Sequence, residues 1–341
     1  MSAPQTTPTS DPQPATRQLT MSEALNEALR QQMEADPGVF VIGEDIGMHG
    51  GLFGVTRDLL DAYGPQRVID SPISEAAICG MGIGGALVGC RPVVELQIFD
   101  FVTLTMDQIA NHAAKWRYMS GGQVSVPMVL RGPISNGIGM AAQHSQSLEA
   151  WFVHTPGLIV MMPSTPYDAK GLLTAAIRDP NPVVFLEKRL LYSRPGPVPS
   201  EPYEIPIGQG EIKRPGTHAT IVATGACVHQ ALQASRSLAR DGIECEVIDP
   251  RTLKPLDLPL ILESVTKTGR LVVVNEGPRS GGYAAEIVAR VIDHAWNELK
   301  AQPERITATD TPIPYAANLE RAVLPSVEAI EAAVRQVVTA A

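Results

Sequence analysis

The chain has 341 residues, of which 44% are hydrophobic and 18% charged, enough for two domains with separate cores. Its formal net charge of −9 argues against nucleic-acid binding, because a phosphate-binding surface is basic. No apolar run is long enough to cross a membrane, so we expect no membrane-embedded segment.

The first 18 residues are rich in Pro, Ser, Thr and Gln and contain one basic residue, Arg17. They lack the apolar centre of a signal peptide and the basic charges of a transit peptide. We therefore predict a disordered tail over 1–18. The four cysteines of the chain are scattered and form no CxxC pair, which favours a reduced, cytoplasmic setting over a structural zinc site.

Helical periods alternate with short apolar runs over residues 19–194. Residues 21–36 have the pattern of an amphipathic helix, with Ser22 near its start and Pro37-Gly38 at its end. The apolar runs suit buried strands and are VFVIGED, RVIDSP, RPVVELQI, VPMVLRGP, LIVMMPS and PVVFLEK. This alternation predicts an α/β domain with parallel strands and helices on both faces of the sheet.

The segment DSPISEAAICGMGIGGALVG, residues 70–89, ends one predicted strand and opens a helix. GMGIGG matches the dinucleotide pattern GxGxxG, but that motif needs its glycines in the turn that leaves the strand. Here Pro72, Ile73 and Ser74 fill the turn, which argues against a nicotinamide-dependent dehydrogenase. Glycine inside a helix costs about 1 kcal/mol relative to alanine. We therefore expect this helix to form a close contact with another helix, which could belong to another subunit.

Glu75 begins the same helix. A carboxylate in the first turn stabilises the helix dipole, with Ser74 as the cap, and this role alone is sufficient to explain the residue. A second interpretation is that the carboxylate faces a cleft at the end of the strand. The local sequence leaves both interpretations open.

Residues 195–215 contain six prolines and have the composition of an extended linker. After this segment the runs ATIVATG, ECEVIDP and RLVVVNEG again alternate with helical periods. Residues 216–341 are therefore predicted to form a second, smaller α/β domain.

Seven segments within residues 43–173 occur together and in order: GEDIG, GGLFGVT, DSPISE, RPVVELQIFDF, DQIANHAAKWRYMSGGQ, QHSQS and PSTPYDAKGLL. Together they resemble the beta subunits of the thiamine-diphosphate-dependent 2-oxo acid dehydrogenases, the decarboxylating components of the pyruvate, branched-chain and acetoin dehydrogenase complexes. The resemblance implies two three-layer α/β domains with parallel sheets. The first would be a thiamine-diphosphate-binding domain of the pyrimidine type, and the second a transketolase C-terminal-like domain.

The resemblance also implies how the cofactor is held. Glu75 matches the carboxylate that bonds the pyrimidine ring nitrogen, where it would hold and polarise the cofactor. Phe101 matches the aromatic residue that stacks on this ring, and a core aromatic is the alternative. Gln97 matches a polar residue beside the ring, and Ile73 matches an apolar residue that packs near it.

Two further positions match residues near the reacting groups of the family. Glu44 matches an acid near the active site. The alternative is that Glu44 is only a turn residue. His144, in QHSQS, matches a histidine that faces the substrate and assists acyl transfer. A surface or capping histidine is the alternative, although polar loops between strands often carry catalytic groups.

The sequence has residues that match one metal site of the family but lacks the motif of another. Asp179 and Asn181, in IRDPNP, match a structural potassium site of some relatives, and Asp-Pro-Asn-Pro is also a good turn. Relatives that bind magnesium and the diphosphate carry GDG followed by Asn, and this sequence has no GDG. The resemblance therefore implies that a separate alpha subunit holds the magnesium and the diphosphate, while this chain supplies half of an active site.

The implied assembly is an alpha-two beta-two tetramer that decarboxylates a 2-oxo acid oxidatively and transfers the acyl group to lipoyl. RYMSGGQ and AAQHSQS look most like the pyruvate and acetoin branches; pyruvate is preferred, with acetoin or a branched-chain 2-oxo acid as the alternatives. The second domain would dock the subunit-binding domain of the dihydrolipoyl acyltransferase, whose lipoyl domain receives the acyl group. Glu276 and Glu286 lie in the region where the family has docking acids. The alternative is that each is only a solvated surface residue. A non-catalytic assembly subunit is disfavoured because Glu75 and His144 occur together.

Overall fold

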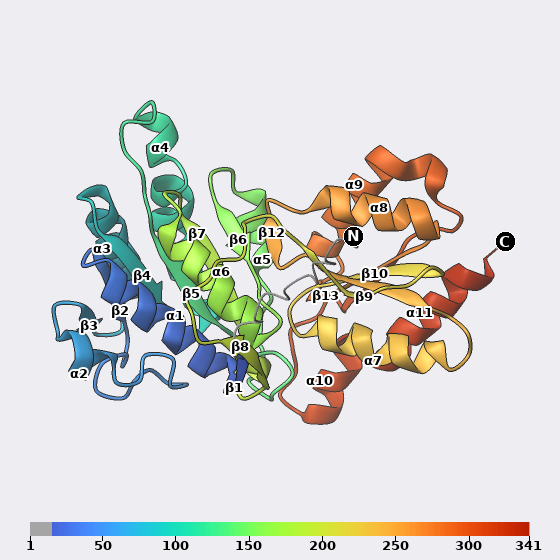
Figure 1. Ribbon diagram of the computed structural model, residues 1–341, viewed down its shortest axis with the longest axis horizontal. Coiled ribbons are helices and arrows are strands. Elements are labelled where there is room, and N and C mark those ends of the chain that lie inside the picture. The colour runs from blue at the N-terminus through green and yellow to red at the C-terminus, as the bar shows by residue number, and fades with distance from the viewer. Residues whose placement is uncertain (1–15, 341) are drawn as a thin grey trace, which may run out of the picture.

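The computed structural model describes residues 16–340, and its larger sheet has seven strands in the spatial order β12-β6-β7-β5-β4-β2-β3 (Figure 1). The neighbouring pairs are parallel except β12 with β6, which is antiparallel. The strands are β2 (Val39–Gly43), β3 (Val68–Asp70), β4 (Arg91–Glu95), β5 (Val129–Ile134), β6 (Ile159–Met161), β7 (Val183–Lys188) and β12 (Thr252–Lys254). The predicted α/β architecture with mainly parallel strands is confirmed.

Helices cover both faces of this sheet because successive strand residues point to opposite sides. Val93 and Val129 share a core with α1 and α6, whereas Val94 and Leu130 share another with α3, η1, η2 and α5. The helical elements are α1 (Met21–Ala35), α2 (Leu59–Tyr63), α3 (Glu75–Leu87), η1 (Phe99–Thr105), η2 (Asp107–Ala113), α4 (Trp116–Met119), α5 (Glu149–His154), α6 (Pro166–Arg178) and η3 (Arg189–Leu191).

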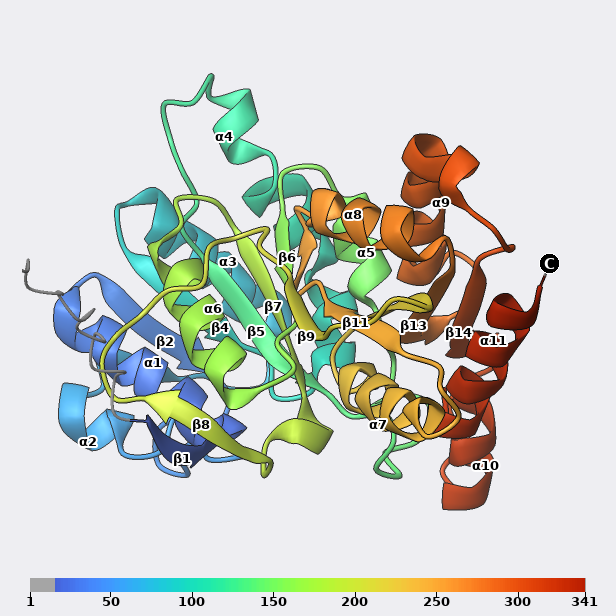
Figure 2. The same ribbon diagram turned by 45° about the vertical axis from the view of Figure 1, so that its right-hand side comes forward.

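The second sheet has five strands in the order β14-β13-β10-β11-β9, and only the β9–β11 pair is antiparallel. Helices α7 and α11 cover one face, and α8 and α9 cover the other (Figure 2). The elements are β9 (Glu211–Arg214), β10 (Ala219–Ala223), α7 (Cys227–Ala239), β11 (Cys245–Asp249), α8 (Leu258–Thr268), β13 (Leu271–Pro278), α9 (Tyr283–Ala295), η4 (Trp296–Glu298), β14 (Glu304–Ala308), α10 (Ala317–Val323) and α11 (Val327–Thr339).

The tail and the proline-rich segment are more ordered than predicted where the structure describes them. Residues 16–18 belong to β1 (Thr16–Thr20), so the prediction of disorder is wrong for them, and 1–15 lie outside the described residues. β1 pairs antiparallel with β8 (Pro195–Pro199), and β9 forms an edge of the second sheet. β8 can contain prolines because it has only one partner strand in its sheet. Proline has no N–H to donate, and the unpaired edge of β8 needs no donors.

The first helix shows how local sequence sets an element boundary. α1 begins at Met21, so Ser22 lies near its start as predicted, and the residue that caps it is Thr20. Thr20 Oγ1 accepts a hydrogen bond from the Glu23 N–H, and the Glu23 carboxylate accepts one from the Thr20 N–H at 2.8 Å. This reciprocal pair is a capping box, which satisfies donors that a helix start leaves free.

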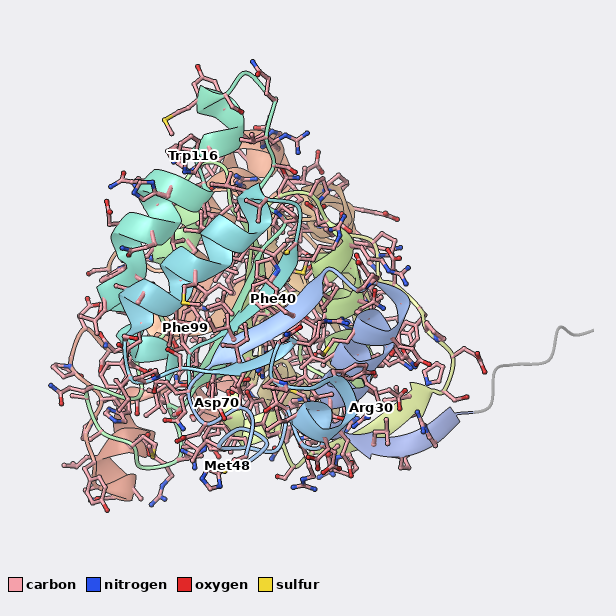
Figure 3. The ribbon with its side chains drawn as sticks, turned by 90° about the vertical axis from the view of Figure 1, so that its left-hand side faces the viewer. Arg30, Phe40, Met48, Asp70, Phe99 and Trp116 are labelled. Carbon is pink, nitrogen blue, oxygen red and sulfur yellow. The ribbon has the colours of Figure 1, made fainter. Side chains whose placement is uncertain are left out.

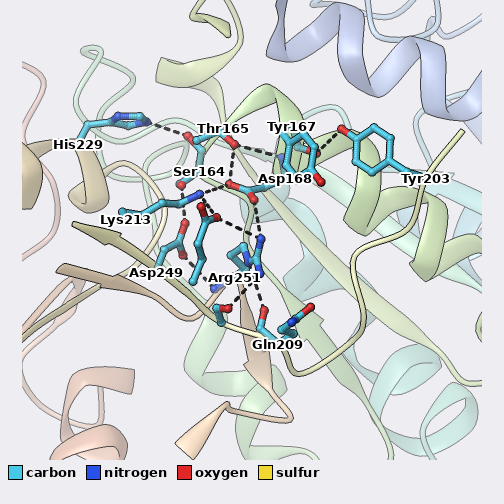
Figure 4. Close-up of polar contacts among 12 residues, drawn as sticks. Ser164, Thr165, Tyr167, Asp168, Tyr203, Gln209, Lys213, His229, Asp249 and Arg251 are labelled. Carbon is cyan, nitrogen blue, oxygen red and sulfur yellow. Dashed lines mark hydrogen bonds and ion pairs between the residues drawn. The ribbon is translucent and has the colours of Figure 1, made fainter. Parts of the chain in front are cut away.

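Buried charges join the two parts of the chain where α6, β9 and β11 meet (Figure 4). Asp168 is fully buried and pairs with Lys213 at 2.8 Å and with Arg251 at 3.1 Å. Both cations also pair with Glu211, and Arg251 N donates to Asp249 Oδ1 at 2.9 Å. We refer to Asp168, Glu211, Lys213, Asp249 and Arg251 as the junction cluster.

Candidate active site

A pocket of about 330 Å³ lies at the carboxyl ends of β2, β3 and β4. Loops that follow parallel strands meet at this edge, which is where α/β sheets usually bind ligands. Five of the residues predicted from the sequence line this one pocket, together with Ile98 and Leu104; the five are Glu44, Ile73, Glu75, Gln97 and Phe101.

Glu75 is the first residue of α3 and is 8% exposed. Ser74 occupies the N-cap position as expected, but its side chain makes no capping hydrogen bond, and its hydroxyl donates to the Pro72 carbonyl at 3.0 Å. The first-turn position still places Glu75 at the positive end of the helix dipole. Both interpretations of Glu75 therefore apply together, because the same carboxylate stabilises the helix start and lines the pocket.

Glu44 lines the same pocket as Glu75 and is 9% exposed. Burial raises the pKa of the Glu44 carboxyl, and the negative charges of Glu75 and Asp45 raise it further. A carboxyl group in this situation retains its proton to higher pH than an exposed glutamate. The pocket thus contains two acids whose charges interact, an arrangement suited to holding a proton against a basic ring nitrogen.

The loop that carries Glu44 is held by its neighbours. A side chain at Gly43 would bring a Cβ to 2.8 Å from the Glu95 carbonyl oxygen, so only glycine fits there. The Asp70 carboxylate accepts hydrogen bonds from Gly47 N at 2.7 Å and Met48 N at 3.4 Å, and Figure 3 shows Asp70 beside Met48. These contacts fix the turn after β2 and with it the position of Glu44.

Phe101 and His144 lie side by side. Their ring centroids are 5.4 Å apart and their planes make an angle of 75°, an edge-to-face arrangement. The alternative of a core aromatic is wrong for Phe101, which is 37% exposed, whereas Phe99 is fully buried. The structure thus brings His144, which lies in the loop between β5 and α5, to the aromatic side of the pocket.

Asp100 is a site residue that the sequence analysis missed. Its Oδ1 accepts hydrogen bonds from Gln146 N at 2.9 Å and Gln146 Nε2 at 3.1 Å, two residues after His144. Burial raises the pKa of the Asp100 carboxyl, and the bonds from Gln146 counteract part of that rise. Its position next to Phe101 was the only signal in the sequence. The contact itself gave no signal, because Gln146 lies far along the chain.

A buried ion group joins β4, which leads into the pocket, to β5 and β7. Arg131 of β5 pairs with Glu187 of β7 at 2.6 Å and also with Glu95 of β4. Burial lowers the pKa of Arg131, but Glu187 and Glu95 raise it more, so the guanidinium stays charged. The group ties together β4, which leads into the pocket, β5, which leads into the loop of His144, and β7, and so it stiffens the sheet beside the site.

The glycines of α3 divide into two pairs. A Cβ at Gly82 would lie 2.4 Å from Val94, and a Cβ at Gly85 would lie 3.0 Å from Phe40. These two glycines let the helix approach the side chains of the sheet, and not another helix as expected. A Cβ at Gly80 or Gly84 would meet no described atom within 4 Å, so the predicted contact with another subunit stays a prediction for them.

Apolar side chains form the rim of the pocket. Ile73 is 80% exposed and Leu104 is 59% exposed, although both line the pocket. Exposed apolar groups around a concave site indicate that another surface covers them. The pocket therefore has the character of one wall of a site.

Asp179 and Asn181 lie at the opposite edge of the sheet, before the amino end of β7. Asp179 Oδ1 accepts hydrogen bonds from Asn181 N at 2.7 Å and Asn181 Nδ2 at 2.9 Å, as in a tight turn. Asn181 Oδ1 accepts one from Arg117 Nη1 at 2.7 Å, so a cation of the protein already faces it. These contacts explain both residues as parts of a turn, and the potassium site stays a prediction. Over residues 16–340, moreover, no group of three or more His, Cys, Asp and Glu could hold a metal.

The two acids expected in a docking region differ. Glu276 is mostly buried and pairs with Lys188 of β7 at 2.6 Å, so it joins the two parts of the chain and is not a solvated acid. Glu286 is exposed on α9 and pairs with Arg290 at 2.7 Å. Only Glu286 has the exposure that a docking residue needs.

Comparison with known proteins identifies both parts of the chain. The family "Transketolase, pyrimidine binding domain" matches residues 17–195, and "Transketolase, C-terminal domain" matches residues 208–330. Among solved structures, the chain is similar to one described as a split gene transketolase, an inactive beta4 tetramer. The TM-score is 0.80 at 21% identity over 94% of this chain and 99% of that chain, which supports the fold.

Closer relatives are beta subunits of dehydrogenases. The pyruvate dehydrogenase E1 component subunit beta-1 of Oryza sativa mitochondria is 48% identical over 94% of this chain and 87% of its own. The 2-oxoisovalerate dehydrogenase subunit beta of Bacillus subtilis is 44% identical over 92% and 97%. The beta subunit of an acetoin:2,6-dichlorophenolindophenol oxidoreductase of Cupriavidus necator is 46% identical over 94% and 97%.

Proposed function

The chain belongs to the family of beta subunits of 2-oxo acid dehydrogenase E1 components, and we propose that it acts in a pyruvate dehydrogenase. The reaction is the oxidative decarboxylation of pyruvate with transfer of the acyl group to lipoyl. The observation that carries the proposal is the pocket in which Glu75, Glu44 and Phe101 meet, with His144 beside it. Acetoin and branched-chain 2-oxo acids remain the alternatives, since relatives of both kinds have similar identities.

The cofactor of this proposal is thiamine diphosphate. The pocket offers a carboxylate pair, an exposed aromatic face and an apolar side chain, which together fit an aminopyrimidine ring. When bound, thiamine diphosphate supplies the carbon that attacks the 2-oxo group and accepts the electrons released by decarboxylation. Its remaining contacts belong to a second subunit, because the pocket has no basic group for a diphosphate among its described lining residues.

Each residue of the pocket has a distinct task in this proposal. Glu75 holds a proton against the ring nitrogen, and Phe101 stacks on the ring and fixes its plane. The raised pKa of Glu44 lets that residue keep a proton beside Glu75, which limits the repulsion between the two acids. Gln97 and Ile73 complete the contact surface around the ring. His144 lies on the substrate side and exchanges a proton during acyl transfer.

The partners follow from what the chain lacks. We infer that an alpha subunit binds magnesium and the diphosphate and covers the apolar rim of Ile73 and Leu104, giving an alpha-two beta-two tetramer. The second domain is proposed to dock the subunit-binding domain of the dihydrolipoyl acyltransferase near Glu286, while the lipoyl domain approaches His144. Potassium binding at Asp179 and Asn181 stays a prediction, and the proposed chemistry does not depend on it.

The location in the cell also stays a prediction. The relatives include bacterial proteins and proteins named as mitochondrial, so the predicted cytoplasmic setting has support only from the bacterial ones. In the described part of the chain, none of the helices has the length and apolar character to span a bilayer.

The function can be tested with the chain co-purified with its alpha subunit. Lipoyl-domain acylation is measured with pyruvate, a branched-chain 2-oxo acid and acetoin as substrates, in the presence of magnesium and thiamine diphosphate. We expect pyruvate to give the highest kcat/KM. A higher value for acetoin or for the branched-chain acid would reassign the substrate, and inactivity on all three would overturn the proposed reaction.

A further inference from the structure

The loop between β5 and α5, residues 135–148, is held by the second domain as well as by the first. Glu320 of α10 is 3% exposed, and its carboxylate accepts two hydrogen bonds from this loop. Oε1 accepts from Gly137 N at 2.8 Å, and Oε2 accepts from Gly139 N at 2.9 Å. Each carboxylate oxygen thus takes one backbone N–H from a segment that is far away in the sequence.

The backbone of the loop is shaped to make this contact. Gly137 and Gly139 both have positive φ angles, 88° and 75°, which glycine adopts without steric cost. Their N–H groups converge on one carboxylate, in the manner of the backbone concavities that bind anions. Hydrogen bonds to an ionised acceptor are stronger than neutral ones, and their loss would leave buried N–H groups without partners.

A second carboxylate holds the other end of the same loop. Asp100 accepts both hydrogen bonds from Gln146, as described above, and His144 lies between this anchor and the Glu320 anchor. Within the loop, His144 N donates to the Ala141 carbonyl at 3.3 Å, and Ala141 has a φ of 61°. The position of the histidine ring beside Phe101 therefore depends on two anchors, one in each domain.

We propose that Glu320 is a positioning residue for His144, through which the second domain sets the geometry of the acyl-transfer side of the pocket. The role of His144 in this inference rests on the proposed function. The anchoring of the loop does not, because it follows from the two hydrogen bonds alone. Glu320 touches neither the pocket nor Phe101 in the contacts described, so its effect must pass through the loop.

The variants are Glu320→Gln and Glu320→Asp, each in the tetramer with the alpha subunit. Glutamine keeps the shape of the side chain but turns one acceptor into a donor that faces an N–H group. Aspartate keeps both acceptors on a shorter side chain and should recover part of the activity. The matched control is Glu298→Gln, because Glu298 is an exposed acid of the same domain without contact to the loop.

Two activities are compared for each variant: acylation of the lipoyl domain and decarboxylation of pyruvate with an artificial electron acceptor. We expect Glu320→Gln to lower lipoyl acylation about 10- to 100-fold, since a displacement of about 1 Å in a site has effects of that size. Decarboxylation with the artificial acceptor should change less than about threefold. Equal losses in both activities, or no loss in either, would overturn the positioning role.

A double-variant cycle tests whether the effect passes through His144. If it does, Glu320→Gln should change lipoyl acylation less than about twofold in a His144→Ala background. Independent, multiplying losses would show that Glu320 acts elsewhere and would overturn the inference. If His144→Ala alone leaves acylation unchanged, the proposed role of His144 fails, and the positioning role fails with it.

Hydrogen exchange tests the anchor without any catalytic assay. Exchange of the Gly137 and Gly139 amides should be at least about tenfold faster in Glu320→Gln than in the original chain, and unchanged in Glu298→Gln. Unchanged exchange would show that the two hydrogen bonds do not hold the loop. This measurement separates a failure of the anchor from a failure of the proposed function. Glu320→Asp serves the same purpose if the glutamine variant does not fold.

Discussion

The pocket and the junction cluster both bury acids, but they treat the charges differently. At the junction, Asp168 is fully buried and is paired with two cations of the same chain. In the pocket, Glu44 and Glu75 are nearly buried, and no Lys, Arg or His is among the described lining residues. In the first arrangement, cations of the same chain balance the buried charge of Asp168, and the ion pairs join the two domains. In the second, no cation among the described lining residues balances the two acids, which indicates a ligand and a partner surface.

The largest expected effect follows from this lack of a balancing cation. The isolated chain should have no decarboxylase activity and should bind thiamine diphosphate at least about 100-fold more weakly than the tetramer with magnesium. The physical reason is that the pocket offers no cation and no metal for the diphosphate. Calorimetric titration of the cofactor into the chain alone, and then into the tetramer, measures the difference. Tight magnesium-dependent binding by the chain alone, with turnover, would contradict the half-site proposal.

The next effect concerns the acid pair itself. Glu75→Gln should reduce turnover of the tetramer by about 10³-fold, because glutamine keeps the volume but cannot hold the proton of a carboxylic acid. Gel filtration should show unchanged assembly, and circular dichroism should show an unfolding midpoint lowered no more than by loss of a charge at another helix start. Glu328→Gln, in the first turn of α11, is the control for loss of charge at a helix start. Nearly normal turnover in Glu75→Gln would remove this residue from the active site.

A smaller effect is expected at the junction, where stability and not activity should change. Asp168→Asn removes the buried charge that faces Lys213 and Arg251, so the free energy of unfolding should fall by about 3 kcal/mol. Glu211→Gln removes the half-exposed acid from the same two cations and should cost at most about 1 kcal/mol. Urea unfolding of the two variants gives the comparison. Equal losses would mean that burial does not distinguish the two pairs.

The smallest effect is a pH dependence at Asp249. Burial, with a contribution from Asp168, raises the pKa of Asp249 to about 7. The folded chain therefore holds a proton that the unfolded chain releases above about pH 4, so this group lowers stability as the pH rises from there to about 7. Asp249→Asn should gain about 1–3 kcal/mol relative to the original chain between pH 4.5 and 7. Urea unfolding at several pH values measures this gain, and a constant difference would contradict it.

Much of the fold could be predicted because its signals are local. The apolar runs predicted β2 to β7 of the first sheet and β10, β11 and β13 of the second, and the helical period predicted α1; β9, β12 and β14 were not predicted. The pairing of β1 with β8 and of β12 with β6 could not be predicted, because short strands with proline or few apolar residues gain their stability from distant partners.

The site was predictable only in part. Local patterns left Glu75 ambiguous, and the pocket residues came from a resemblance carried by seven segments in order. Asp100 and Glu320 were missed because their partners are loop amides, which no side-chain pattern reveals. The solvated alternative for Glu276 was wrong because its ion-pair partner, Lys188, is far away in the sequence.

The short strand β12 has a consequence for how the chain unfolds. It follows the second domain's β11 in the sequence, yet it completes the edge of the first sheet, and one hydrophobic cluster continues from Ile42 to Ile287. We therefore expect the two domains that sequence families distinguish to unfold as one cooperative unit. Calorimetry should record a single unfolding transition, and a chain cut at the proline-rich segment would leave the β6 edge and half of a shared core open to water.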